Sequence, residues 1–343
     1  MTMTPIAGLP TGSCLIVGGY GYRNLGDEAI LAGLLRLLGR DEVTVVSRMP
    51  ADTSARYGVK SVGIRGALPA LRRHRNLVIG GGGLFGRDMG RIGRLLPLFG
   101  LVAVALGRDV SIVGVGIDAT MPRSTAFLLR LLARRASVVV VRDRASADEL
   151  ARRGIPADVR PDLSTLTPSA GRVAGLRTIR NAGLDPGRRP VVGLALTAVN
   201  PAVVEATVSA VTSAVDALPG IDFLLVPMSR HPFVAAHDDE VLARRLIALR
   251  PRLRLLATDD PSEALGVFET LTVAVCMRYH GLLFAERAGI PIIPIVYAEK
   301  CRHWLAERGR KPIELAPSAI VAEIELAVEV ARARAATSLE RSA

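Results

Sequence analysis

Short apolar runs alternate with longer amphipathic stretches along the first half of this chain. The runs are rich in β-branched residues and apolar over their whole length, as strands covered on both faces of a parallel sheet are. They lie at residues 14–18, 42–47, 77–79, 110–115 and 137–141, with helical periodicity at 27–38, 92–107 and 125–135. This alternation predicts a doubly wound, Rossmann-like α/β domain.

The same alternation returns in the second half. The expected strands are 191–196, 223–227, 253–257, 273–277 and 292–296, and the expected helices are 201–217, 238–249, 261–268, 281–288 and 318–336. Periodicity fades over 171–190, where glycine, proline and arginine dominate, which favours a linker. We therefore predict a flexible N-terminus (1–12), an N-terminal Rossmann-like domain (13–170), a hinge or linker (171–190), a C-terminal Rossmann-like domain (191–316), and a C-terminal helix and tail (317–343).

Composition agrees with two cores and narrows the range of partners. The chain has 343 residues, of which 50% are hydrophobic, and a single core rarely grows to that size. Its formal charge is +12, carried almost wholly by arginine. Aromatic residues make up only 4% and no nucleic-acid-reading motif is present, so we expect no nucleic-acid partner. Anionic substrates or an anionic membrane surface suit this charge better.

Three cysteines without metal-ligand spacing indicate a reducing cytoplasm and no bound metal. The N-terminus lacks the basic start and apolar core of a signal peptide. The longest apolar run, 95–106, is too short to span a bilayer and contains Pro97, so we interpret it as a buried helix. We expect a cytoplasmic protein, and leave open a peripheral attachment to the inner face of the plasma membrane and a homo-oligomer.

The turn "GGYGYRNLGDEAIL" (18–31) follows the first expected strand and opens a helix, as phosphate-binding turns do. Gly19 and Gly21 fit the first two places of a dinucleotide fingerprint, but Asn24 occupies the third. No acid follows the next strand, although Arg48 would suit a 2′-phosphate, so the signal for a nicotinamide cofactor is weak. The alternative is a tight turn in which Asn24 or Asp27 caps the helix.

A second glycine-rich loop, "VIGGGGLFGRD" (78–88), also follows an expected strand. Successive glycines let a ligand approach backbone N–H groups without interference from Cβ atoms. The alternative is a flexible surface loop. Because ligands bind outside the carboxyl ends of parallel strands, we expect both glycine turns to bind substrate in a cleft between the two domains.

The richest chemistry lies in "VAVCMRYHGLLFAERAGIPIIPIVYAEKCRHWLAERG" (273–309). Arg278 and His280 stand two residues apart at the end of an expected strand. Gly281 opens the following helix, whose free N–H groups attract anions. The next strand brings Lys300 to the same edge. A guanidinium, an imidazole and an ammonium group together predict a site for a small, highly charged anion.

The motifs "GYRNLGDEAIL", "GGGLF", "GVGI", "VRDRASADEL", "PM…DDEVLARRL" and "MRYHGLLFAERAGIPIIPIVYAEK" together resemble the polysaccharide pyruvyltransferases, in the correct order over nearly the whole chain. The two-domain organisation resembles the glycosyltransferase-B (GT-B) architecture. The resemblance implies transfer of the enolpyruvyl carbons of phosphoenolpyruvate to two hydroxyls of a sugar, or of a lipid-linked glycan, in a cell-wall or exopolysaccharide precursor. It implies a pyruvate ketal as product and phosphoenolpyruvate as co-substrate, without a further cofactor.

The resemblance also suggests roles for individual residues. Arg278 and His280 match the family's phosphoenolpyruvate-binding and catalytic pair, with His280 as general acid and Asp27 as the group that takes the hydroxyl proton or orients the sugar. Many relatives place an arginine after the first strand of the second domain, where this chain has Thr197. The remaining donor-site candidates are Gly281, Lys300, Arg230 and His231, and the acceptor-site candidates are Gly21, Asn24, Asp27, Glu28, Gly82 and Gly83.

Three other functions stay open. A nucleotide-sugar glycosyltransferase on the same architecture needs a platform for uridine and ribose, which is not evident after the strands of the second domain. A non-catalytic, anion-binding paralogue is favoured by Thr197. An NADP-dependent oxidoreductase has only the incomplete fingerprint of the first turn in its favour.

Overall fold

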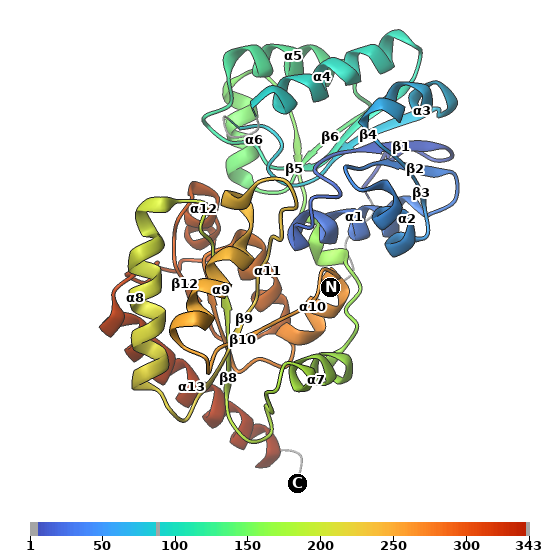
Figure 1. Cartoon of the computed structure of the whole chain (residues 1–343). Coiled ribbons are helices and arrows are strands. Elements are labelled where there is room, and N and C mark those ends of the chain that lie inside the picture. Colours follow the sequence, from blue (N-terminus) through green and yellow to red (C-terminus); the bar gives the residue numbers. More distant parts are fainter. Residues whose placement is uncertain (1–5, 87–89, 341–343) are drawn as a thin grey trace. The chain divides into compact units, whose positions relative to one another are not determined.

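The computed structural model describes residues 6–86 and 90–340, and the chain divides into two compact units (Figure 1). Unit 1 comprises Met1–Tyr22 and Asp27–Pro168, and unit 2 comprises Arg23–Gly26 and Ser169–Ala343. Each unit is an α/β domain built on a parallel sheet. Four residues of the first glycine turn therefore belong to the second unit, which the order of elements along the chain did not predict.

Unit 1 contains a seven-stranded parallel sheet in the order β3-β2-β1-β4-β5-β6-β7. The strands are β1 (Cys14–Val17), β2 (Val43–Val46), β3 (Lys60–Val62), β4 (Asn76–Gly80), β5 (Asp109–Val115), β6 (Val138–Val141) and β7 (Asp158–Val159). The helices are α1 (Leu25–Leu38), α2 (Pro50–Tyr57), α3 (Ala67–Arg73), α4 (Gly90–Ala105), α5 (Arg123–Ala133) and α6 (Arg144–Arg152), with short 3₁₀ turns η1 (Ile64–Gly66) and η3 (Leu163–Leu166). The order reverses between β1 and β4, where such sheets bind ligands.

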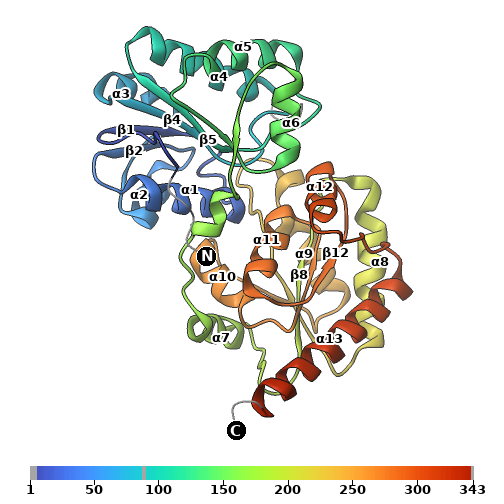
Figure 2. The same cartoon turned by 180° about the vertical axis from the view of Figure 1, so that it is seen from behind.

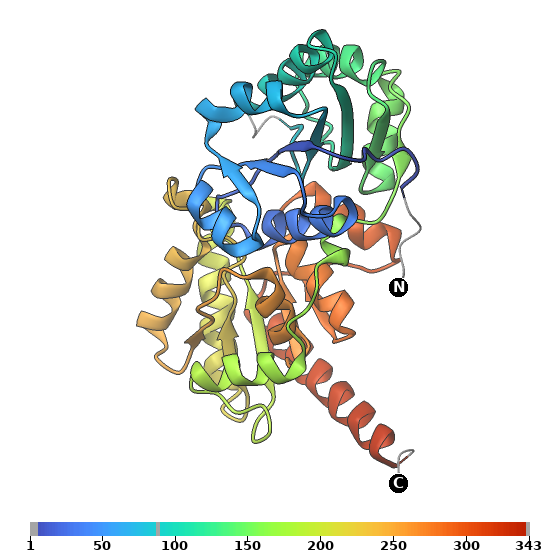
Figure 3. The ribbon, with the colours of Figure 1, turned by 90° about the vertical axis from the view of Figure 1, so that its right-hand side faces the viewer.

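Alternate residues of each strand in unit 1 pack on opposite faces. Leu15 and Ile79 contact the core beneath α3 to α6, whereas Ile16 and Val78 contact the core beneath α1 and α2. Figures 2 and 3 show the sheet between these two helix layers. The strands are buried on both sides, which explains why their sequences are apolar rather than alternating.

Unit 2 contains a five-stranded parallel sheet in the order β10-β9-β8-β11-β12. The strands are β8 (Val191–Ala195), β9 (Asp222–Leu225), β10 (Arg254–Leu255), β11 (Val273–Cys276) and β12 (Ile292–Pro294). The helices are α7 (Arg172–Asn181), α8 (Pro201–Ala217), α9 (Asp239–Leu249), α10 (Pro261–Phe268), α11 (Tyr279–Ala288), α12 (Glu299–Glu307) and α13 (Pro317–Glu340), with the 3₁₀ turn η4 (Ala235–His237). The reversal lies between β8 and β11.

Both faces of the unit 2 sheet are covered. Helices α8, α9 and α13 pack with Leu194 and Val275 on one face. On the other side α10 packs against α7 and α11, and the rings of Phe268 and Phe284 meet edge to face with centroids 5.6 Å apart. The carboxyl ends of β8 and β11 are thus held rigidly by helices on both sides.

The interval 171–190 is built differently from the linker that its composition suggested. Residues Arg172–Asn181 form α7, which packs against α10 within unit 2. A Cβ on Gly175 would lie 1.9 Å from the carbonyl oxygen of Gly266. The glycine at this crossing therefore permits a close approach of two helices rather than flexibility. The unit boundary falls at Ser169, close to the predicted end of the first domain.

The two ends of the chain extend partly outside the described residues, which begin at 6 and end at 340. Of the predicted flexible N-terminus, Ile6 is buried in the core of unit 1 and Gly8 approaches Val138, so this part is packed. The predicted C-terminal helix is α13, which packs along α8 in unit 2.

The apolar run 95–106 is helical as predicted, but the prediction that it is buried is wrong for one face. Gly100 and Ala103 face the sheet and α5, whereas Leu95, Leu98 and Val102 are exposed. Helix α4 packs on the sheet with one side only. Its other side is apolar as well but remains exposed to solvent. Within the described residues, every helix is too short or too polar to cross a bilayer.

Candidate active site

Arg278 follows β11 and forms the centre of the candidate donor site in unit 2. Its Nε donates to both carboxylate oxygens of Asp239, at 3.2 and 2.9 Å, and its Nη2 donates to Oδ1 at 2.5 Å. This side-on pair does not engage Nη1. Asp239, the first residue of α9, is in turn held by the backbone N–H of Ser229 at 3.0 Å. The guanidinium is therefore fixed in one orientation before any ligand arrives.

Electrostatics keep Arg278 charged although it is mostly covered. Burial would lower the pKa of its guanidinium, but the adjacent Asp239 carboxylate outweighs burial and raises that pKa above its ordinary value. Tyr297 forms a side-chain hydrogen bond to the same guanidinium. The Nζ atom of Lys300 lies 6.0 Å from the centre of the Tyr297 ring, within reach of a cation–π contact. Tyr297 is thus a common neighbour of Arg278 and Lys300.

The first turn of α11 adds partial positive charge to the site. Arg278 is the N-cap, and the first bond of the helix runs from the Leu282 N–H to the Arg278 carbonyl at 3.2 Å. The N-terminal end of α11, with its partial positive charge, therefore lies directly beside Arg278. The helix begins two residues before the predicted Gly281. A Cβ on Gly281 would lie 2.9 Å from the Cβ of Ala195, so this glycine lets α11 pack closely on β8.

His280 packs directly on a backbone segment from the start of the chain. A Cβ on Gly26 would lie 1.8 Å from the His280 Nδ1 and 2.2 Å from its Cγ. The ring also meets that of Tyr279 edge to face, with centroids 5.3 Å apart. Gly26 is not one of the fingerprint positions, the third of which is Asn24, and its contact with His280 supplies the reason for a glycine here.

The segment Arg23–Gly26 is bound to the end of β9 in unit 2. Asn24 and Ser229 form a β-bridge, the Leu25 N–H donates to the Met228 carbonyl at 2.8 Å, and the Arg230 N–H donates to the Arg23 carbonyl at 3.0 Å. Arg23 adopts a left-handed backbone with φ of 54°. Such strain is retained where surrounding contacts enforce it. Asn24 Oδ1 also accepts from the Gly26 N–H at 3.0 Å, so it caps α1 as the alternative interpretation of this turn expected.

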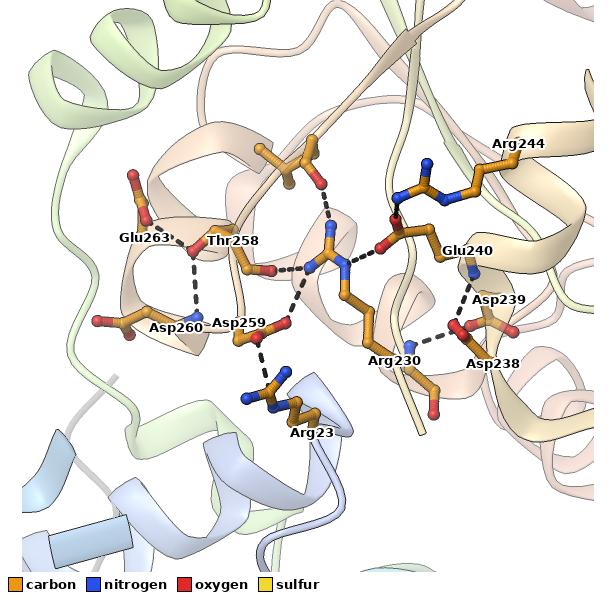
Figure 4. A network of polar contacts seen from close by, with 12 residues as sticks. Arg23, Arg230, Asp238, Asp239, Glu240, Arg244, Thr258, Asp259, Asp260 and Glu263 are labelled. Carbon is orange, nitrogen blue, oxygen red and sulfur yellow. Dashed lines mark hydrogen bonds and ion pairs between the residues drawn. The ribbon is translucent and has the colours of Figure 1, made fainter. Parts of the chain in front are cut away.

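Arg230 lies in the loop after β9, and all the nitrogens of its guanidinium take part in a network of hydrogen bonds and ion pairs, shown in Figure 4. Its Nε pairs with Glu240 at 2.7 Å and its Nη1 with Asp259 at 3.0 Å, and the guanidinium also donates to the carbonyls of Thr258 and Leu256. Asp259 additionally pairs with Arg23 at 3.8 Å. Two carboxylates already neutralise the charge of Arg230, so these contacts do not favour the suggestion that it supplies charge to the donor.

His231 also has a local task. Its Nδ1 accepts hydrogen bonds from the backbone N–H groups of Phe233 and Val234, at 3.2 and 3.0 Å. Burial, and to a lesser degree the nearby His237, lowers the pKa of this imidazole. His231 thus orders the loop before η4, and the structure does not bring it to Arg278 through any described contact.

Thr197, the departure from the family's arginine, lies in the same cluster as Arg278. It is fully buried, and its hydroxyl hydrogen-bonds the Asp239 carboxylate. Burial raises the pKa of that carboxyl against the opposing attraction of Arg278. A neutral residue at this position supports the acid that orients Arg278, whereas an arginine would compete for it.

Unit 1 gathers a second cluster at the carboxyl ends of its own strands. A Cβ on Gly82 would lie 2.7 Å from Oδ1 of Asp27 and 3.7 Å from Nη1 of Arg142. Arg142 follows β6, is almost fully buried, and pairs with Asp143 at 3.2 Å and Asp162 at 3.6 Å. Asp27 and Gly82 therefore meet as predicted.

Of the other predicted acceptor residues, Gly21 and Glu28 stabilise the turn, whereas Gly83 lies in an exposed loop. The Gly21 N–H donates to Glu28 at 2.9 Å, and the Tyr57 hydroxyl donates to the same carboxylate at 2.8 Å. Burial raises the pKa of Glu28. These contacts fix the turn and leave Glu28 buried, so it shapes the edge rather than facing a ligand. Gly83 is exposed, with open space where a Cβ would lie.

Sequence reasoning missed Asp239 and Tyr297, the two side chains that hold Arg278. Asp239 lies 39 residues before Arg278. The signal that the sequence offered for it was an acidic residue at the start of an expected helix. Tyr297 precedes the predicted Lys300 in "IVYAEK". An aromatic residue with a hydroxyl group, directly after an expected strand, was the signal that could have identified it.

Comparison with solved structures defines the class of fold. The chain is similar to the UDP-GlcNAc 2-epimerase of Methanocaldococcus jannaschii (TM-score 0.61, 12% identity, 92% of this chain and 93% of that one). It is also similar to the E. coli ADP-heptose LPS heptosyltransferase II (TM-score 0.52, 13% identity, 92% and 98%). A third similar structure is the sucrose-phosphate synthase of Thermosynechococcus elongatus (TM-score 0.50, 12% identity, 94% and 91%). The domains are of the GT-B class.

The sequence gives the narrower assignment. The model of the polysaccharide pyruvyl transferase family matches residues 24–299, and this chain belongs to that family. The match begins in the turn that packs on His280 and ends just beyond Tyr297. A sequence comparison with curated proteins gives no match.

Proposed function

We propose that this chain transfers the pyruvyl carbons of phosphoenolpyruvate to two hydroxyls of a sugar, forming a pyruvate ketal and releasing phosphate. Family membership supports pyruvyl transfer as the reaction class. The observation that carries the choice of donor is the Arg278 guanidinium, fixed by Asp239 beside the first turn of α11. A fixed guanidinium next to the N-terminal end of a helix is suited to an anion with two acidic groups.

The donor would be held at two points. We assign its carboxylate or phosphate to Arg278 and its other acidic group to the positive, N-terminal end of α11. Because Asp239 balances the charge of Arg278, the net positive charge comes from Lys300 and the helix start. This differs from a family site with an additional arginine at the place of Thr197.

His280 would act as the general acid. Its imidazole delivers a proton to the methylene carbon of phosphoenolpyruvate, which becomes a methyl group and leaves C2 electrophilic. One sugar hydroxyl adds to C2, and the bond between C2 and the phosphate oxygen breaks. The second hydroxyl then adds to C2 and closes the ketal. Of the two hydroxyl protons, one restores His280 and the other leaves with phosphate.

Asp27 would serve the acceptor in unit 1. Its carboxylate, next to Gly82 and Arg142, is suited to accept a hydrogen bond from a sugar hydroxyl and to take its proton. The acceptor is a sugar or a lipid-linked glycan in a cell-wall or exopolysaccharide precursor. We propose that the reaction takes place in the cytoplasm and that it needs no cofactor beyond phosphoenolpyruvate itself.

The test is incubation of the purified chain with phosphoenolpyruvate and a panel of sugar-phosphate and lipid-linked acceptors. Release of inorganic phosphate together with an acceptor product carrying a pyruvate ketal, identified by mass spectrometry, is the expected result. A parallel panel of nucleotide sugars addresses the glycosyltransferase alternative, and nucleotide release there would overturn the proposal. Binding of phosphoenolpyruvate without phosphate release across the panel would instead favour an anion-binding paralogue.

A further inference from the structure

Helix α4 presents an apolar strip to solvent. Leu95, Leu98, Val102 and Leu106 follow one another at spacings of three and four residues, which places them on one side of the helix. Leu95 is 58% exposed and Leu98 46% exposed. An exposed leucine is ordinary by itself, but a continuous strip over three turns is a mark of an interaction surface.

Neighbouring helices extend this strip into a continuous surface. On α5, Phe127 is 62% exposed and Leu131 is exposed one turn later. A Cβ on Gly100 of α4 would lie 2.5 Å from Leu132 Cδ2, which shows how closely the two helices pack. Figures 1 and 2 show α3, α4 and α5 on the same side of the unit 1 sheet.

The end of α3 joins this surface, because Arg108 Nη2 donates to the Arg72 carbonyl at 2.9 Å. We call the surface the α3–α5 face. Its exposed apolar members are Ile64, Leu68, Leu95, Leu98, Val102, Leu106, Phe127 and Leu131.

The charge on the α3–α5 face has a single sign. Segments 63–73, 90–108 and 123–135 contain no Asp or Glu. Their exposed arginines are Arg65, Arg72, Arg73, Arg94, Arg123, Arg130, Arg134 and Arg135. No ion pair joins these arginines to a carboxylate among the described residues. The helices of unit 2 differ, since Arg245 pairs with Glu205 and Arg250 with Asp216.

We propose that the α3–α5 face docks on the surface of an anionic phospholipid bilayer. A second copy of the chain is a poor occupant, because a two-fold interface would set unpaired arginines against one another. A bilayer satisfies both parts of the face. Its phosphates attract the arginines, and its interface accepts the apolar side chains without requiring a helix to span. The proposal is independent of the chemistry at Arg278 and stands or fails separately.

Sedimentation with vesicles tests this docking. The full chain is expected to bind vesicles of equal parts phosphatidylcholine and phosphatidylglycerol, to bind phosphatidylcholine alone much more weakly, and to be released by salt. The double variant Leu98→Glu, Val102→Glu should reduce binding by at least about tenfold. Arg130→Gln with Arg134→Gln should reduce it by about 25-fold, since each arginine near such a surface contributes about fivefold.

Val173→Glu is the matched control, because Val173 is 84% exposed on α7 in unit 2. This variant should bind vesicles like the parent chain. Circular dichroism and thermal unfolding confirm that each variant is folded, and light scattering gives its mass. Equal binding to both vesicle types, or unchanged binding by both double variants, would overturn the proposal. A parent dimer that Leu98→Glu converts to a monomer, without vesicle binding, would instead make the face a subunit interface.

Discussion

Two strands of unit 2, β9 and β11, lie on either side of β8 in the sheet. Each is followed by an arginine and a histidine, and the two pairs have opposite uses. Arg278 and His280 follow β11, and Arg230 and His231 follow β9. The arginines are almost equally covered, with side chains 14% and 13% exposed. Exposure therefore does not distinguish them, and the difference lies in their partners.

The partner sets explain the two uses. Arg230 is bonded by two carboxylates and two backbone carbonyls, which together use all three of its nitrogens. Arg278 is oriented by one carboxylate, through Nε and Nη2, and by the side chain of Tyr297, and it lies at the start of a helix. An arginine bonded by two carboxylates and two carbonyls stabilises a fold, whereas one with a single carboxylate partner is better suited to bind a further anion.

The largest expected effect is on catalysis at His280. His280→Ala should lower kcat by about 10²–10⁴-fold, because no other group would supply the proton for the methylene carbon. The assay is phosphate release at saturating phosphoenolpyruvate and acceptor. His231→Ala is the matched control and should leave kcat within about twofold of the parent, since His231 orders a loop. Unchanged turnover in His280→Ala would refute the catalytic assignment.

The second effect is on stability at Arg230. Arg230→Met should lower the free energy of unfolding by about 3 kcal/mol, because it leaves Glu240 and Asp259 without their shared cation. Urea denaturation measures the change. Arg245→Met is the control, since its pair with Glu205 is exposed to solvent and should contribute little to stability. If Arg230→Met kept its stability and raised the KM for phosphoenolpyruvate, Arg230 would return to the donor site.

A smaller change is expected from Arg278→Lys. The lysine keeps a charge for Asp239, so the fold should survive, but a single ammonium cannot reproduce the side-on pair and also present an oriented edge to the donor. We expect the KM for phosphoenolpyruvate to rise by about tenfold, equivalent to about 1.4 kcal/mol. Arg302→Lys, on the exposed Arg302–Glu299 pair, provides the comparison. Equal KM values in the two variants would show that the orientation of Arg278 is unimportant.

The sequence predicted the positions of these groups better than their uses. Buried parallel strands are apolar throughout, so β11 was expected at 273–277 and is found at Val273–Cys276. The edge strands β3 (Lys60–Val62) and β7 (Asp158–Val159) were missed, because an edge strand is short and partly exposed and carries little pattern.

The site depends on contacts between residues far apart in the chain, which periodicity does not encode. Arg278 and Arg230 look alike as cations after strands, and only the positions of Asp239, Glu240 and Asp259 separate them. Gly26 likewise has no evident purpose in the sequence until His280 is seen against it. The local sequence pattern thus predicts which edge of the sheet holds the candidate site. The tertiary contacts determine which side chains at that edge can bind a ligand.

The smallest expected effect is a pH dependence at His231. Burial lowers the pKa of this imidazole below its unfolded value of about 6.5. The stability that the neutral ring contributes is therefore complete above that unfolded value and is lost as the pH falls through the folded pKa. The structural reason is that a protonated Nδ1 cannot accept from the N–H groups of Phe233 and Val234.

His231→Asn tests this dependence, because an amide oxygen accepts similar backbone hydrogen bonds and does not titrate. The stability of the parent should fall relative to that of the variant as the pH falls from about 7 to 5. Parallel curves would mean that protonation leaves the loop before η4 intact, and that the histidine after β9 contributes to the fold only through packing.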